Sequence, residues 1–254
     1  MGKLKAIFFD QDGVIIDTER DGHRVSFNET FKEFGYDVAW GVEEYHELLQ
    51  ISGGKERMKH YLQTRGFGKP VPPAEVDDLI ARMHKRKTAM FIEMVESGRL
   101  PLRPGIHRFM QEALAAGLKL GVCTTSSEKA AHAIAYQILK DVTFEVVLAG
   151  DVVEKKKPAP DIYNLALQKT GLTPDECFVV EDSRNGVLAG KAAGMRIVAT
   201  TNVYTEKEDL SPAEVIVSCL GDPGGEKAVL RKGPADVVRD GVVHVADVVR
   251  AFEG

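Results

Sequence analysis

The sequence predicts an α/β fold, and two observations carry this prediction. Short apolar runs alternate with amphipathic helical patterns through the second half of the chain, as in consecutive βαβ units. Residues 18–98 lack this alternation and show apolar residues at helical spacing instead. We therefore expect a doubly wound, Rossmann-like, mostly parallel sheet core formed by residues 1–17 and 99–254, with an inserted α-helical cap domain formed by residues 18–98.

The apolar runs of the core have the length and composition of buried parallel strands. They lie at residues 4–9, 118–123, 144–149, 177–180 and 195–199. The segments between them carry apolar residues three and four positions apart, which predicts amphipathic helices. These predicted helices span about 106–117, 131–138, 160–171 and 186–193, and a last short one spans about 245–252. The Gly- and Pro-rich stretch 221–241 predicts no element.

Apolar stripes at helical spacing also define the cap. One stripe contains Phe27, Phe31 and Phe34, and a longer one runs from Val76 to Met94. The chain leaves the cap near Pro101 and Pro104, where a helix has to end. Two adjacent crossings between cap and core would form a natural hinge.

Composition restricts the class of protein. The chain has 254 residues with 44% hydrophobic content, enough for one large core or a core with a smaller module. Its net charge of -5 gives no attraction to nucleic acid or to an anionic membrane, and no apolar stretch approaches the ~20 residues that span a bilayer. Cys123, Cys177 and Cys219 lie in apolar runs without metal-ligand spacing. We expect a cytoplasmic, soluble and monomeric protein with reduced thiols.

The first strand delivers two aspartates, Asp10 and Asp12, into a turn at Gly13. Two like charges ~4 Å apart cost about 4 kcal/mol at an effective dielectric constant of about 20. The pair therefore suggests a bound cation and aspartate-based phosphoryl transfer. The alternative is an ordinary turn in which Asp and Gly serve the backbone.

Polar residues also follow the next three strands. Thr124, with Thr125 and Ser126, leads into a helix and could hold a phosphate there, or could simply cap that helix. Lys157 stands before two prolines that fix its direction. Glu181 and Asp182 are oxygen donors suited to Mg²⁺, or a helix cap. Because parallel strands end at the same edge of a sheet, we expect the four groups to converge.

Taken in order, these motifs resemble the signature set of the haloacid dehalogenase superfamily. The motifs are Asp10-Gln11-Asp12-Gly13-Val14, Thr124, Lys157 before Pro158-Ala159-Pro160-Asp161, and Glu181-Asp182-Ser183. A helical cap between the first two motifs is similar to that of β-phosphoglucomutases and phosphoglycolate phosphatases. The segments 17–24, 53–58, 84–88, 102–105 and 218–223 most resemble CbbY-type sugar phosphatases, known as xylulose-1,5-bisphosphate phosphatases.

The resemblance implies a role for each motif. Asp10 would be the nucleophile that forms an aspartyl-phosphate, and Asp12 the general acid and base. Thr124 and Lys157 would hold the transferring oxygens, and Asn185 would be a further substrate contact. Asp10, Asp12 through its backbone carbonyl, Asp182 and Glu181 would surround Mg²⁺. The expected activity is a Mg²⁺-dependent phosphatase for a small phosphorylated sugar, such as a ketopentose bisphosphate.

Two other activities stay open at this point. One is a β-phosphoglucomutase-type sugar phosphomutase that uses the same aspartyl-phosphate. The other is a phosphatase for another small phosphate, such as phosphoglycolate.

The cap offers candidate substrate contacts. Lys87, four residues after Met83, lies on the apolar face of its helix. It could reach the edge of that face or pair with an acid, or it could point into the cleft toward a second phosphate. Lys55 and Arg57 face the same choice, while Gly53 and Gly54 allow close backbone approach. Glu19 and His23 could contact sugar hydroxyls or lie at the surface.

Overall fold

The computed structural model describes residues 3–51 and 53–254, and it divides into two compact units. The core unit comprises Met1–Asp17 and Pro101–Gly254, and the helical unit comprises Thr18–Leu100. The helical unit ends at Leu100, two residues beyond the predicted end of the cap at residue 98. Leu100 belongs to the helical unit because its buried side chain packs close to Gly22 of that unit.

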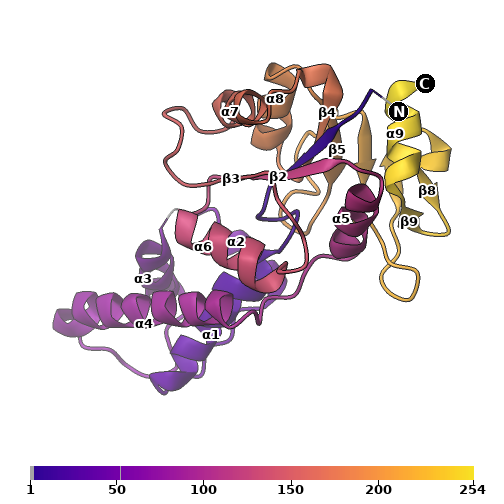
Figure 1. The fold of residues 1–254 in the computed structure, drawn as a ribbon. Coiled ribbons are helices and arrows are strands. Elements are labelled where there is room, and N and C mark those ends of the chain that lie inside the picture. The colour runs from indigo at the N-terminus through magenta and orange to yellow at the C-terminus, as the bar shows by residue number, and fades with distance from the viewer. Residues whose placement is uncertain (1–2, 52) are drawn as a thin grey trace. The chain divides into compact units, whose positions relative to one another are not determined.

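The core unit is built on a seven-stranded sheet in the order β3-β2-β1-β4-β5-β6-β7. Figure 1 shows β1, in indigo, beside β2 and β4. All neighbouring pairs from β3 to β6 are parallel, and β7 pairs with β6 in the antiparallel direction. The strands are β1 (Ala6–Phe9), β2 (Lys119–Cys123), β3 (Val146–Leu148), β4 (Cys177–Glu181), β5 (Arg196–Thr200), β6 (Val215–Val217) and β7 (Leu230–Lys232). The predicted doubly wound fold class is confirmed.

Helices cover the sheet, and they begin and end close to the predicted positions. They are α5 (Ile106–Ala115), α6 (Glu128–Ala133), α7 (Asp161–Thr170), α8 (Arg184–Ala192) and α9 (Val245–Glu253). The helix predicted over 131–138 begins earlier, since Ser127 accepts a hydrogen bond from Ala130 N, and its last part is a π-helical turn, Ile134–Ile138.

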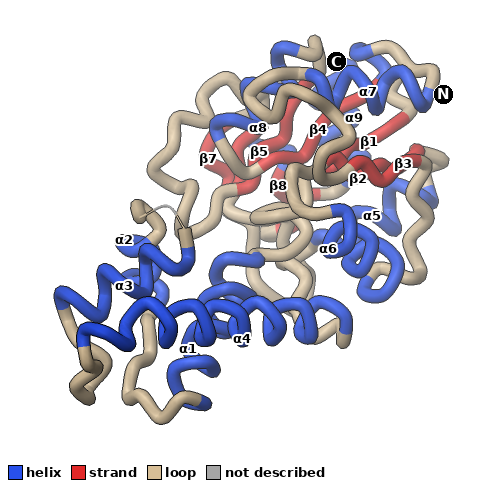
Figure 2. The backbone as a smooth tube through the Cα atoms, turned by 90° about the vertical axis from the view of Figure 1, so that its left-hand side faces the viewer, coloured by secondary structure: helices blue, strands red, loops and turns tan. Residues whose placement is uncertain are grey.

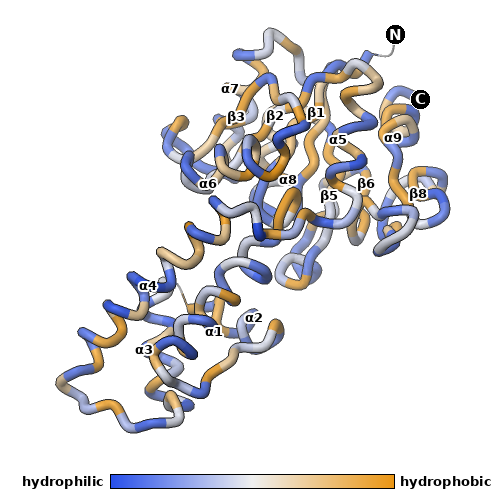
Figure 3. Tube along the Cα trace, turned by 60° about the horizontal axis from the view of Figure 1, so that its bottom comes forward, coloured by the Kyte–Doolittle hydropathy of each residue, from blue (hydrophilic) through white to orange (hydrophobic). Residues whose placement is uncertain are grey.

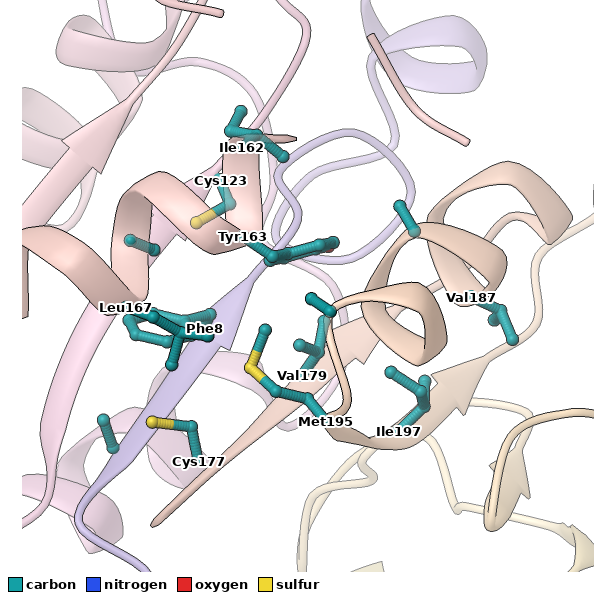
Figure 4. Packing of buried hydrophobic residues seen from close by; sticks show 14 of the residues in the cluster. Phe8, Cys123, Ile162, Tyr163, Leu167, Cys177, Val179, Val187, Met195 and Ile197 are labelled. Atoms are coloured by element: carbon teal, nitrogen blue, oxygen red, sulfur yellow. The ribbon is translucent and has the colours of Figure 1, made fainter. Parts of the chain in front are cut away.

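The two central apolar runs predicted as strands are buried on both faces of the sheet. Every residue of β1 and β4 is buried, as expected for central parallel strands. Figure 4 shows Phe8 of β1, Val179 of β4 and Ile197 of β5 in one cluster with Tyr163 and Leu167 of α7. This packing fixes the position of the strand ends that carry the polar motifs.

The stretch after β5 contains strands that the sequence did not predict. Besides β6 and β7, a small hairpin pairs β8 (Val238–Arg239) with β9 (Val242–Val243). Each of these strands has only two or three residues, too few for a hydrophobic period to be recognised. Short 3₁₀ turns lie at Pro174–Glu176 and Ala235–Val237.

Among its described residues, the helical unit contains four α-helices and no strand. Figure 2 accordingly draws the described part of this unit only in the colours of helix and loop. The helices are α1 (Arg24–Glu33), α2 (Val42–Leu48), α3 (Gly54–Thr64) and α4 (Val76–Glu96), with a π-helical turn at Thr18–His23 and a 3₁₀ turn at Pro73–Glu75. Phe27 and Phe31 of α1 pack against Trp40 with ring centroids 4.8 and 4.9 Å away.

The long helix α4 is amphipathic, and Figure 3 shows hydrophobic and hydrophilic positions alternating along it. Its buried residues include Leu79, Ile80 and Met83, which belong to the predicted stripe. None of the helices in the described part of the chain is both long and apolar enough to cross a membrane.

Candidate active site

The polar motifs follow strands that are neighbours in the sheet. The chain passes from β1 to β2 and β3 on one side of the sheet, then to β4 and β5 on the other. In an open α/β sheet, ligands bind beyond the carboxyl ends of the strands at such a switch point. Asp10 follows β1, and Glu181 ends β4. The Asp10 N–H donates to Val180 O over 3.0 Å, which joins the two strand ends directly.

Lys157 connects the groups at this edge. Its ammonium group donates to Asp10 Oδ1 over 2.7 Å, to Glu181 Oε1 over 2.6 Å and to the backbone carbonyl of Cys123 over 2.9 Å. These partners come from the ends of β1, β4 and β2. The Lys157 side chain is 7% exposed, so solvent screens the contacts little. Residues 147 positions apart in the sequence therefore form one buried ion pair.

Glu181 is completely buried and makes hydrogen bonds through both carboxylate oxygens. Its Oε1 also accepts from the Tyr163 hydroxyl over 2.6 Å, and its Oε2 accepts from Asp182 N over 3.1 Å. The absence of a side chain at Gly186 makes room for this carboxylate, since a Cβ atom there would overlap it. Glu181 therefore holds Lys157 and the backbone at Asp182 in place.

Asp182 lies against the turn that follows Asp10. Its Oδ2 accepts from Asn202 Nδ2 over 2.7 Å. Gly13 in that turn has φ +76°, and a Cβ atom there would overlap the Asp182 carboxylate. Glycine is required at this position for both reasons.

Burial and mutual repulsion raise the pKa values of the two aspartates. Burial raises the pKa of Asp10 to about 6, with Lys157 opposing the rise and Glu181 adding to it. Burial, then the charges of Glu181 and Asp10, raise the pKa of Asp182 well above its usual range. Burial alone would lower the pKa of Lys157, but the carboxylates of Asp10 and Glu181 raise it above its ordinary value. The cluster is therefore short of positive charge.

The acidic groups fit a divalent cation. One carboxylate oxygen from each of Asp10, Glu181 and Asp182 lies within 4.8 Å of the others. Three carboxylates and the single ammonium of Lys157, when all are ionised, leave two negative charges uncompensated. Oxygen ligands with this charge suit Mg²⁺, whereas a soft metal would need sulfur or nitrogen donors. Because both oxygens of Glu181 already accept hydrogen bonds, the two aspartates are the better-suited ligands.

The other predicted core residues lie on the same loops. Asp12 is half-buried, and its charge contributes to the raised pKa of Asp182. Thr124 is buried directly after β2, and its hydroxyl accepts from Ser126 N over 3.1 Å. Thr125 is exposed and Ser126 half-buried, and Asn185 is exposed in the first turn of α8.

Within the helical unit, Lys87 is buried rather than placed at the edge of its apolar face. Its ammonium nitrogen, Nζ, lies 4.7 Å from the ring centroid of Phe27 and 5.4 Å from that of Phe91. The same nitrogen lies 2.8 Å from His23 Nδ1. Burial lowers the pKa of Lys87 to about 8, although nearby Glu19 raises it. Burial and the charge of Lys87 lower the pKa of His23 to about 3, so His23 is neutral and accepts from the ammonium.

The remaining predicted residues of the helical unit divide into buried and exposed ones. Arg57 is buried and donates to the carbonyls of Leu48 and Ile51, so it holds the loop after α2. Glu19 accepts from the Tyr45 hydroxyl over 2.7 Å, and Arg57 also donates to that hydroxyl. Lys55 is exposed in the first turn of α3, and Gly53 and Gly54 lie at the start of that helix.

Two residues of the site, Tyr163 and Asn202, were not predicted from the sequence. Tyr163 lies in the first turn of α7, close behind Lys157, and reads there as an ordinary core residue. Asn202 follows β5 in the same way that the predicted residues follow their strands. The rule that ligands bind beyond strand ends could have identified Asn202, had it been applied to this strand as well.

Comparison with known proteins gives an assignment. The family model of haloacid dehalogenase-like hydrolases matches residues 4–194. A CBBY-like protein from Arabidopsis thaliana is 48% identical over 226 residues, 87% of this chain and 71% of that protein. Protein CbbY from Rhodobacter capsulatus is 43% identical over 215 residues, 84% of this chain and 92% of that protein. A crystal structure of a CbbY mutant from Rhodobacter sphaeroides in complex with xylulose 1,5-bisphosphate is 38% identical, covers 87% of this chain and 97% of that one, and has a TM-score of 0.62.

The doubly wound sheet, with a buried acidic cluster at its switch point, defines an α/β protein of the Rossmann-like type with a candidate cation site where such folds bind their ligands. With the match over most of its length, this chain belongs to the haloacid dehalogenase-like hydrolases. Within that family it is a phosphatase similar to CbbY, which confirms the resemblance predicted from the motifs.

Proposed function

We propose that this protein is a Mg²⁺-dependent phosphatase that removes phosphate from a ketopentose bisphosphate, such as xylulose 1,5-bisphosphate, through an aspartyl-phosphate on Asp10. The observation that supports this most is the buried ion pair between Lys157 and Asp10 beside Asp182. A lysine held at the nucleophile can neutralise the charge on a transferring phosphoryl group.

In the first step, an oxygen of Asp10 attacks phosphorus and the bond between phosphorus and the sugar oxygen breaks. Asp12 gives its proton to the leaving sugar oxygen. In the second step, Asp12 removes a proton from water, which attacks the aspartyl-phosphate and releases inorganic phosphate and Asp10. Lys157 and Thr124 stabilise the phosphoryl oxygens in both steps.

Asp10, Asp182 and the backbone carbonyl of Asp12 would hold the Mg²⁺, with Glu181 as a weaker candidate because its oxygens already accept hydrogen bonds. When bound, the ion supplies positive charge that stabilises the transferring phosphoryl group and the crowded carboxylates. The raised pKa values of Asp10 and Asp182 are the reason to expect this requirement, since ionised carboxylates so close together need a counter-charge.

The second phosphate of the substrate requires a further cation, and we propose Lys87 for it, with the helical unit acting as a cap. Support comes from the buried position of Lys87 beside neutral His23, and from the substrate in the similar CbbY complex. Glu19, His23, Lys55 and Arg57 are proposed to contact or orient the sugar. Arg57 would act mainly by holding its loop, because its donors are used within the helical unit.

The buried, free cysteines Cys123, Cys177 and Cys219 suit a reducing compartment, and we propose a cytoplasmic monomer.

The test is a phosphate-release assay with purified protein, Mg²⁺ and xylulose 1,5-bisphosphate. Release is expected with the wild type and is expected to be lost both with excess chelator and in Asp10→Asn. Parallel reactions with phosphoglycolate and with β-glucose 1-phosphate, the latter followed by glucose 6-phosphate formation, examine the other two activities. Preferred turnover of either compound would replace the proposed substrate. Hydrolysis by Asp10→Asn at the wild-type rate would exclude the mechanism.

A further inference from the structure

The loop after β5 approaches the acidic cluster from a third strand end. It begins beyond Thr200, where β5 lies next to β4 in the sheet. Its Asn202 donates through Nδ2 to Asp182 Oδ2 over 2.7 Å. Asn202 is half-buried, and Asp182 is buried with 7% of its surface exposed. The contact is therefore partly shielded from competing water.

The orientation of the Asn202 amide is determined by its other contacts. Its Oδ1 accepts from Tyr204 N over 2.9 Å and from Thr205 N over 3.1 Å. Both of these partners are donors, so the oxygen has to face the loop and the NH₂ group has to face Asp182. The loop thus presents a fixed donor to one oxygen of that carboxylate.

Three loops converge at this point. A Cβ atom on Gly13 would overlap the Asp182 carboxylate and would lie 2.7 Å from Asn202 Nδ2. The turn after β1, the turn after β4 and the loop after β5 therefore touch around Asp182 Oδ2. Among the described residues, Asn202 is the side chain that donates to this carboxylate.

We propose that Asn202 is a positioning residue that holds Asp182 Oδ2 and thereby directs Oδ1 toward the divalent cation. The proposal rests on the proposed function, in which Asp182 is a metal ligand. Ligating carboxylates are commonly held by hydrogen bonds from a second layer of residues, whose loss weakens metal binding about 10- to 100-fold. Asn202 would act through Asp182 without touching substrate.

The experiment measures metal binding without substrate. Mn²⁺ serves as the probe, because the free ion is counted by its electron paramagnetic resonance signal during a titration. Asn202→Ala removes the donor together with the oxygen that accepts from the loop amides. Asn202→Ser keeps a side-chain oxygen that can accept from a neighbouring loop amide, but its hydroxyl is too short to reach Asp182.

Glu208→Ala is the matched control. Glu208 lies in the same loop, and its carboxylate accepts from Arg184 N over 2.6 Å, just beyond Ser183. It therefore ties the loop to the start of α8 rather than to the Asp182 carboxylate. A variant of this exposed residue is expected to change Mn²⁺ affinity by less than about twofold. Circular dichroism and cooperative thermal unfolding verify that each variant is folded.

The expected result is a dissociation constant for Mn²⁺ that rises about 10-fold or more in both Asn202 variants. Stabilisation by saturating Mg²⁺ should fall in parallel, by about 1.4 kcal/mol for each tenfold loss of affinity. A folded Asn202→Ser protein with wild-type affinity would overturn the proposal. So would an equal loss of affinity in Glu208→Ala, which would assign the effect to the loop as a whole. A wild-type protein that binds no Mn²⁺ would instead refute the metal site of the proposed function, and this inference with it.

Discussion

Replacing Asp10 by asparagine should stabilise the metal-free protein at neutral pH, even though Asp10 is the proposed nucleophile. The reason is that too little positive charge lies near the buried Asp10 carboxylate. Burial and the Glu181 carboxylate outweigh Lys157 and raise the pKa of Asp10 from 3.8 to about 6. A rise of this size corresponds to a penalty of about 3 kcal/mol for the ionised form in the folded protein.

The sign of the pH dependence follows from the raised pKa. Below 3.8 Asp10 is protonated in both the folded and the unfolded protein, so the penalty is absent. As the pH rises from 3.8 to about 6, the folded protein retains the proton longer than the unfolded chain, and the free energy of unfolding falls. Above about 6 the full penalty is present. The neutral amide of the Asp10→Asn variant does not ionise and avoids this penalty.

The assay is urea unfolding with excess chelator at about pH 8 and about pH 4. Asp10→Asn should gain up to about 3 kcal/mol over the wild type at the higher pH and little at the lower one. Asp77→Asn, with a side chain 86% exposed, is the control and should change stability by less than about 0.5 kcal/mol. A variant that is less stable than the wild type at both pH values would refute the electrostatic reasoning.

Three further predictions concern side chains around Glu181 and in the helical unit. Tyr163→Phe removes the hydroxyl that donates to buried Glu181. Urea unfolding should show a free energy of unfolding lower by about 1.5 to 3 kcal/mol. An unchanged unfolding midpoint would show that this hydrogen bond does not stabilise the fold. Gly186→Ala places a Cβ atom against the Glu181 carboxylate and should cost about 1 to 3 kcal/mol, whereas Gly224→Ala, with open space around it, should be nearly neutral in the same measurement. Lys87→Ala should reduce kcat/KM for the bisphosphate much more than for an aryl phosphate. Equal losses of kcat/KM on both substrates would show that Lys87 has only a structural role.

The sheet core could be predicted because its central strands are buried on both faces. β1 and β4 require continuous apolar residues, which form a readable pattern in the sequence. The carboxyl ends of these strands then determine where Asp10 and Asp182 lie. The strands β6 and β7 were not predicted because a strand of three residues shows too little hydrophobic periodicity.

The hydrogen bonds within the site could not be predicted. Nothing in the sequence distinguishes Tyr163 from any buried tyrosine, because its role depends on how α7 packs beside β4. The partner of Lys87 is likewise set by tertiary packing: His23 lies 64 residues away in the chain. Sequence patterns identify residue types at strand ends, whereas the donors that orient them come from distant segments.

The central claim is that Asp10 accepts the phosphoryl group. Rapid quenching of the Mg²⁺-loaded protein during turnover of xylulose 1,5-bisphosphate, followed by peptide mass spectrometry, tests it most directly. We expect one added phosphoryl group on the peptide that carries Asp10, labile to hydroxylamine as an acyl phosphate is. A phosphoryl group on another residue during turnover would contradict the claim.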